Sequence, residues 1–134
     1  MKNKIAAILA AAFSLLVVSA PLVAHHGTAS FDDKTITLKG TVTEWVWSNP
    51  HCFLKFDVKE GSGNVAHWAV ETQAPSTMVQ WGWARTSFKA GDEVTVTLQP
   101  VKNGAPIGST RTVTFADGTV LVANGVSPNP PSAK

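Results

Sequence analysis

The sequence has few of the residues on which several protein classes depend. Its 134 residues include one cysteine, Cys52, and no tyrosine. A single cysteine excludes an intrachain disulfide, so packing must stabilise the fold. The chain also lacks a Gly-x-Ser-x-Gly motif, a phosphate-binding loop, a Cys-x-x-Cys pair and paired carboxylates at a catalytic spacing. No standard enzyme class is supported, and we expect a binding protein rather than a catalyst.

Basic residues are also few once the amino terminus is set aside. Lys2 and Lys4 belong to the eleven Lys and Arg residues, so residues 25–134 carry nine basic and nine acidic side chains. A nucleic-acid-binding protein needs a concentrated basic surface that displaces counterions from phosphates. The sequence offers no Lys/Arg cluster of this kind, and nucleic acid is not an expected partner.

Residues 1–24 have the pattern of a secretory signal peptide: two lysines, an apolar run at Ile5–Val18, and small residues after it. The run is shorter than the roughly 20 residues that a membrane-spanning helix needs. Cleavage is expected after Ala24 rather than Ala20, because Pro21 fits poorly in an extended protease-bound chain. We therefore expect a periplasmic or secreted protein without a membrane anchor, of a length that suits one domain.

The rest of the chain predicts short strands separated by turn residues. β-Branched and aromatic residues that alternate with polar ones are typical of half-buried strands. This pattern gives expected strands at residues 35–47, 51–58, 65–72, 93–100, 109–118 and 119–123. One short helix is expected at residues 74–83, because Pro75 suits a first helical turn and Gly82 ends the segment.

Gly40 interrupts the first expected strand. A glycine inside a strand often permits a bulge or a sharp coil of the chain. A bulge would turn Trp45 and Trp47 toward the interior, although their odd numbers place them opposite Ile36 and Val42.

Three strands, a helix and two or more further strands predict an all-β fold with one short helix. We expect a five- to six-stranded OB-like Greek-key barrel, the oligonucleotide- and oligosaccharide-binding architecture, over residues 35–123. A small β-sandwich is the alternative. Residues 25–34 would form an arm before the barrel, and residues 124–134, which hold three prolines, a disordered tail. Proteins with this fold have many different functions, so the fold alone does not indicate which function this protein has.

The adjacent histidines His25 and His26 are the strongest local signal. Cleavage after Ala24 would give His25 a free α-amine, which can chelate Cu(II) together with its ring Nδ1. His51 follows the Asn49-Pro50 turn and is the candidate third ligand. Other interpretations stay open: His26 can bind copper through a peptide nitrogen, both arm histidines can be solvated or pack on the barrel, and His51 can hydrogen-bond the turn.

The tryptophans and the remaining histidine give a second set of candidates. An indole offers a flat face and one donor to a ligand, but large aromatic residues also fill small barrels. Trp68 and Trp81 are expected in the core, and Trp47 and Trp83 are expected to be exposed ligand contacts.

His67 shares a strand face with Glu71, which predicts a charged pair or a ligand contact. Cys52 is expected to be a buried core residue rather than a metal ligand.

Four segments together resemble a family of small exported bacterial proteins known only as a domain of unknown function: AHHGTASFD, LKGTVTEWVWSNPH, HWAVETQAPSTMVQWGW and FKAGDEVTVTLQPVKNG. Members share a His-His pair after the signal, a Trp-x-Asn-Pro-His turn, a Gly-Trp after the helix and a Gly-Asp-x-Val strand. The match covers most of residues 24–121, although the arm is longer before Phe31 than the family's His-His-Ser-Phe. The resemblance implies the fold and export, and it brings no activity.

We therefore expect an exported β-barrel that binds a ligand, with copper at His25, His26 and His51 favoured. The partner would be a protein or a small ligand. A protein- or glycan-binding module that uses exposed tryptophans is one alternative. A copper-dependent oxidoreductase, which would need an open coordination position on the same chelate, is another.

Overall fold

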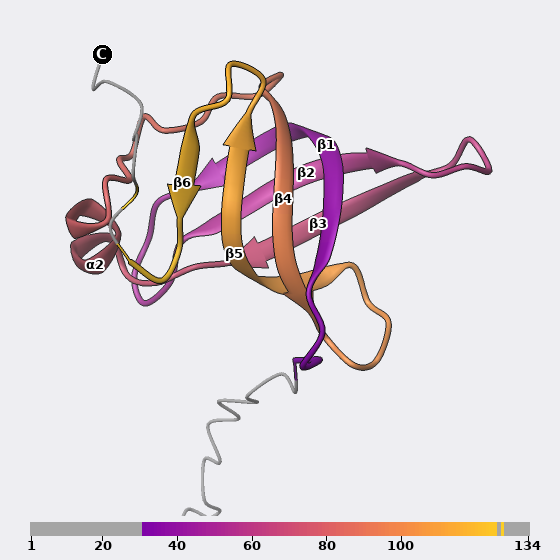
Figure 1. Cartoon of the computed structure of the whole chain (residues 1–134), viewed down its shortest axis with the longest axis horizontal. Coiled ribbons are helices and arrows are strands. Elements are labelled where there is room, and N and C mark those ends of the chain that lie inside the picture. Colours follow the sequence, from indigo (N-terminus) through magenta and orange to yellow (C-terminus); the bar gives the residue numbers. More distant parts are fainter. Residues whose placement is uncertain (1–30, 126, 128–134) are drawn as a thin grey trace, which may run out of the picture.

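Six strands and one short helix make up residues 31–125 and 127, the part of the chain that the computed structural model describes (Figure 1). They are β1 (Ile36–Val46), β2 (Phe53–Lys59), β3 (Val65–Glu71), α2 (Pro75–Gln80), β4 (Glu93–Pro100), β5 (Ile107–Phe115) and β6 (Val120–Val122). The predicted strands and helix are confirmed. The helix ends at Gln80, and its C-cap residue Trp81 is followed by Gly82, whose φ is 88°.

The strands form a closed barrel of five strands with one strand added. β1, β2 and β3 are an antiparallel meander, and β1 also pairs with β4, which pairs with β5. Ala69–Glu71 of β3 run parallel to Ile107–Ser109 of β5 and close the barrel. β6 continues beside β5 where β3 ends. This closure confirms the OB-like barrel and rules out the β-sandwich.

The core consists of the inward side chains of all five barrel strands. Alternate residues of β4 are buried at Val94, Val96 and Leu98, and the same pattern places Leu54 and Phe56 inside. α2 lies at one end of the barrel and contributes Met78 to this cluster (Figure 1). Branched and aromatic side chains with period two therefore produce both the strands and their common interior.

A bulge does reorient Trp45, but it lies three residues after Gly40. Val42 faces Phe56 and Glu44 faces the next residue, Lys55, so Thr43 has no opposite residue on β2. The extra residue reverses the parity of β1, and Trp45 then packs against the core.

Gly40 has a different role, because it allows a close approach of two strands. A Cβ built at Gly40 would lie 2.4 Å from the carbonyl oxygen of Asp57 and 2.9 Å from Cδ2 of Phe56. No side chain fits in this space, so Gly40 permits β1 to coil sharply over β2.

Both ends of the described chain attach to the barrel. Phe31 forms a bridge with Val101, and the backbone N–H of Asp32 donates to the carbonyl of Pro100 at 2.8 Å. Ser127, within the segment expected to be a tail, is buried, and its Oγ accepts a 2.9 Å hydrogen bond from the N–H of Val122. A hydroxyl that satisfies the backbone of β6 is the physical reason for this packing.

Cys52 lies in the core with an exposed fraction of 0%, as expected. Its Sγ is 3.8 Å from the carbonyl of Ser48. Burial disfavours the thiolate and raises the pKa of Cys52 above the ordinary value of 9.0, despite the opposing effect of this hydrogen bond.

We expect Gly40→Ala to lower the free energy of unfolding by about 3 kcal/mol or to prevent folding, because the added methyl group overlaps the backbone of β2. Urea unfolding followed by tryptophan fluorescence measures the change. Gly61→Ala is the matched control, since nothing lies within 4 Å of its Cβ position, and a change within about 0.5 kcal/mol is expected there. Equal effects of the two substitutions would contradict the close approach.

The raised pKa of Cys52 predicts a loss of stability above pH 9. The folded pKa exceeds the unfolded one, so this contribution is complete below the unfolded pKa and is lost as the pH rises through the folded pKa. The free energy of unfolding should fall by up to about 1.4 kcal/mol per pH unit in this window. Urea unfolding between pH 8 and pH 10 measures the slope, which Cys52→Ala should reduce, and the absence of tyrosine removes one competing titration.

Candidate functional site

The described residues contain no preformed metal centre. In residues 31–125 and 127, no group of three or more His, Cys, Asp and Glu side chains is placed to hold a metal ion. His25 and His26 lie outside this part of the chain. A metal site on the described surface would therefore need ligands from residues outside the described part of the chain.

His51 lies on the surface beside a carboxylate. Its Nδ1 is 3.5 Å from Oε2 of Glu71, and the two side chains are 42% and 32% exposed. The β2–β3 register pairs Phe53 with Glu71, which brings the end of β3 beside the two residues that precede β2, His51 and Cys52. A carboxylate at one ring nitrogen orients an imidazole and leaves the other nitrogen for an outside ligand.

The backbone of the β1–β2 turn holds His51 in this position. The hydroxyl of Ser48 donates to the carbonyl of His51 at 3.1 Å. Cys52 follows directly, but its thiol points into the core. His51 and Cys52 therefore do not converge on one site, in agreement with the alternation of side chains along a strand.

His67 pairs with Asp57, and the expected pairing with Glu71 is wrong. Its Nδ1 is 2.6 Å from Oδ1 of Asp57, and its side chain is 79% exposed. His67 and Glu71 share a face of β3, but four residues of a strand separate them by roughly 13 Å. The directly opposite residue on β2 is far closer, and the register makes it Asp57.

Trp83 is a core residue, and its expected exposure is wrong. It is 2% exposed, its Nε1 donates to the carbonyl of Val122 at 2.9 Å, and its ring centre lies 5.7 Å from that of Trp45. Gly82, with its positive φ, turns the chain after α2 back toward the barrel, which places the indole inside. A buried indole offers no face to a ligand.

The other tryptophans are half-buried. Trp47 follows β1, and its ring centre lies 5.7 Å from that of Trp45. Trp68 and Trp81, expected in the core, pack against it with part of their surface exposed. Trp47 therefore keeps a partly accessible indole, whereas Trp83 does not.

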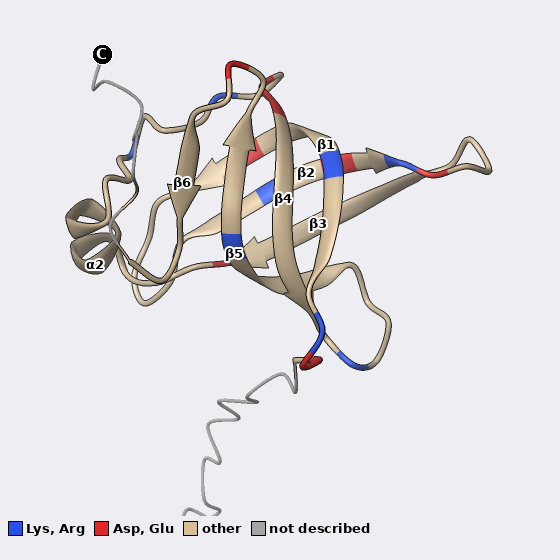
Figure 2. Cartoon of the chain, viewed as in Figure 1, with Lys and Arg blue, Asp and Glu red and all other residues tan. Residues whose placement is uncertain are grey.

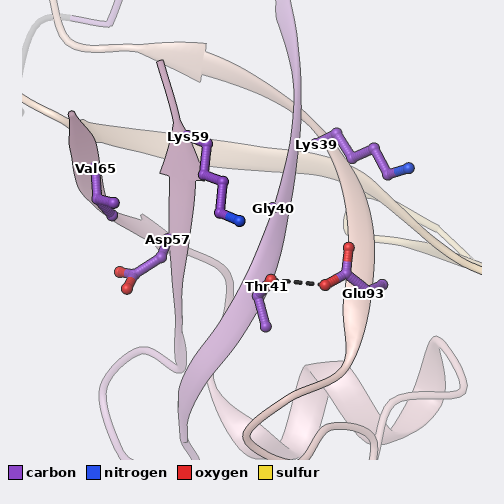
Figure 3. Close-up of a pocket in the computed structure, with 7 residues that line it drawn as sticks. All are labelled: Lys39, Gly40, Thr41, Asp57, Lys59, Val65 and Glu93. Atoms are coloured by element: carbon purple, nitrogen blue, oxygen red, sulfur yellow. Dashed lines mark hydrogen bonds between the residues drawn. The ribbon is translucent and has the colours of Figure 1, made fainter. Parts of the chain in front are cut away.

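A polar groove on the outer face of the barrel was not expected from the sequence. Its volume is about 490 Å³, and it lies where β1 separates from β2 (Figure 3). The groove is lined by Lys39, Gly40, Thr41, Asp57, Lys59, Val65 and Glu93. Basic and acidic residues are interspersed over this side of the sheet (Figure 2).

Four polar residues form one row across the strands at the groove. The register places Glu93 opposite Thr41, Thr41 opposite Asp57, and Asp57 opposite His67. The hydroxyl of Thr41 donates to Oε1 of Glu93 at 2.7 Å, drawn as a dashed line in Figure 3. Together with the His67–Asp57 contact, this gives both carboxylates a partner.

The lysines of the groove differ from its carboxylates. Lys39 and Lys59 are exposed, and neither forms an ion pair with any residue in the described part of the chain. The period-two pattern predicts that all these residues face outward. Their convergence depends on the register, which no local pattern indicates.

No helix in the described residues has the length and apolar character needed to cross a membrane.

Comparisons with known proteins place the chain in a family. Residues 11–110 match a family of unknown function, DUF6152. No curated protein and no solved structure gave a match. The matched range includes the turn of His51, the helix α2 and the Gly-Asp-x-Val strand, which carried the resemblance seen in the sequence. The chain therefore belongs to DUF6152, a family of unknown function.

Proposed function

We propose that the protein is exported, is cleaved after Ala24, and binds copper without catalysing a reaction. His25 supplies its α-amine and ring, His26 lies beside it, and His51 completes the set of nitrogen ligands. The observation that carries this proposal is the exposed imidazole of His51, which Glu71 contacts at one ring nitrogen.

The strand ladder supplies the path from the arm to His51. Phe31 bridges to Val101, the N–H of Val101 donates to the carbonyl of Ile107 at 3.0 Å, and Ile107 pairs with Ala69. Phe31, Val101, Ile107 and Ala69 thus lie in one row across four neighbouring segments of the protein. Phe31 is therefore three strand spacings, roughly 14 Å, from Ala69. Glu71 lies two residues further along β3, roughly 7 Å from Ala69.

The arm is long enough to follow this path. His25 precedes Phe31 by six residues, which span at most roughly 20 Å when extended. The side chains of both histidines add to this reach, so the amino terminus can approach the His51–Glu71 pair. His67 lies equally far from Ala69 in the opposite direction, which makes it the rival third ligand.

The donor set suits copper more than other metals. An α-amine and imidazole nitrogens are the ligands that Cu(II) binds in tetragonal geometry. The unperturbed pKa of an α-amine, about 7.7–8.0, allows a metal to replace its proton at neutral pH. Glu71 would act on the ring of His51 as an outer-shell partner that fixes its orientation.

Tryptophan-based ligand binding has less support, because burial removes Trp83 as a contact. No observation favours the copper oxidoreductase over simple binding.

The test begins with the intact mass of exported protein, which identifies its first residue. Calorimetric titration with Cu(II) should then give submicromolar affinity for wild type and a large loss for His25→Ala and His51→Ala. Glu71→Gln should weaken binding roughly tenfold. Affinity should fall at acid pH, where protons compete for the nitrogens.

Two controls decide between the alternatives. Protein that retains extra residues before His25 should lose the tight site, and equal affinity there would overturn the amino-terminal chelate. His67→Ala should bind copper as wild type does. Loss of binding in His67→Ala with retention in His51→Ala would overturn the assignment of His51.

A further inference from the structure

The groove exists because β1 changes partners at Gly40. β1 and β2 pair from Val46↔Phe53 only as far as Thr41↔Asp57. The earlier residues of β1 pair with β4, whereas β2 continues with β3 to Lys59↔Val65. On the amino-terminal side of Thr41, β1 therefore diverges from β2, and no strand of the described residues lies between them (Figure 3).

This divergence leaves a free edge on β1. The N–H of Val42 donates to Asp92 at 2.8 Å, and the carbonyl of Val42 accepts from Gly91 at 2.8 Å, so the backbone of Val42 faces the β4 side. Backbone groups alternate along an antiparallel strand, so those of Thr37 and Lys39 face the β2 side. No β2 residue pairs with either of them in the described structure. Such an edge is a template for another extended chain.

The side chains around this edge favour a particular chemistry. Lys39 and Lys59 stand on the outer face. Figure 3 shows Lys59 directed across the gap toward β1, and Lys39 extending from β1 over β4. Neither lysine forms an ion pair in the described chain. The carboxylates differ because each contacts a neighbouring side chain: Glu93 accepts from the hydroxyl of Thr41, and Asp57 contacts His67.

The inner face of the same strands is apolar. Leu38 and Val58 are half-buried neighbours of the two lysines and point toward the barrel interior. A strand placed beside β1 would present alternate side chains to these two faces.

We propose that the groove binds an extended segment of a partner protein in which acidic and apolar residues alternate. Its backbone pairs with the edge of β1 at Thr37 and Lys39. The acidic side chains lie on the outer face beside Lys59, with Lys39 of β1 as the second cation, and the apolar ones contact Leu38 and Val58. The groove volume of about 490 Å³ lies in the range of ligand-binding sites. Edge addition supplies affinity through the backbone and selectivity through alternate side chains. This site is independent of the copper proposal.

The test measures fluorescence anisotropy of labelled five-residue peptides with the whole exported protein. Val-Glu-Val-Glu-Val should bind, and Val-Lys-Val-Lys-Val should bind at least roughly tenfold more weakly. Two further probes carry N-methyl groups on either the glutamates or the valines. Only one of these sets of N–H groups can face β1, so one methylated peptide should lose binding and the other should retain it.

Variants locate the site on the protein. The double substitution of Lys39→Glu and Lys59→Glu should weaken binding of the acidic peptide at least roughly tenfold. Lys102→Glu, at an exposed lysine between β4 and β5, is the matched control and should bind as wild type does. Circular dichroism establishes that each variant is folded.

Several results would overturn the proposal. These are equal binding of the acidic and basic peptides, equal binding of both methylated peptides, and an equal loss in Lys102→Glu. Displacement of the acidic peptide by free glutamate at the same concentration as unlabelled peptide would instead assign the groove to small anions.

Discussion

The close approach of β1 to β2 at Gly40 is the constraint on which the rest of the structure depends. A single long strand has to pair with β4 in its first half and with β2 in its second half, and it does so by coiling where only hydrogen fits. The bulge at Thr43 then restores an inward position for Trp45. Closure of the barrel through β3 and β5 follows from this geometry, since β1 belongs to both halves of the sheet.

The same constraint shapes one of the two surfaces for which a function is proposed. Divergence of β2 from the residues of β1 that precede Gly40 opens the groove and leaves backbone groups of these residues unpaired by β2. At the far end of β2, the register brings Glu71 to His51 and leaves that imidazole accessible. The His51–Glu71 pair lies on the surface, whereas the groove combines outward lysines with the half-buried Leu38 and Val58.

Much of the fold could be predicted from the sequence, because strands and helix depend on local periodicity. The alternation of Val94, Val96 and Leu98 predicts both a strand and its buried face. A bulge in β1 was predicted, but its position was predicted at Gly40 and it lies at Thr43. Gly40 instead allows the close approach of β1 to β2. The DUF6152 match agrees with the resemblance and adds no activity.

The sequence by itself determined the order of the strands along the chain, the inward face of each strand, the burial of Cys52 and the accessibility of His51 near a turn. Only the tertiary structure decided that His67 pairs with Asp57, that Trp83 is buried, and that Lys39 and Lys59 line one groove. The reason is that parity assigns a residue to a face of the sheet, whereas the register between strands assigns its neighbours. Register depends on contacts between segments far apart in the chain, which a local pattern does not contain.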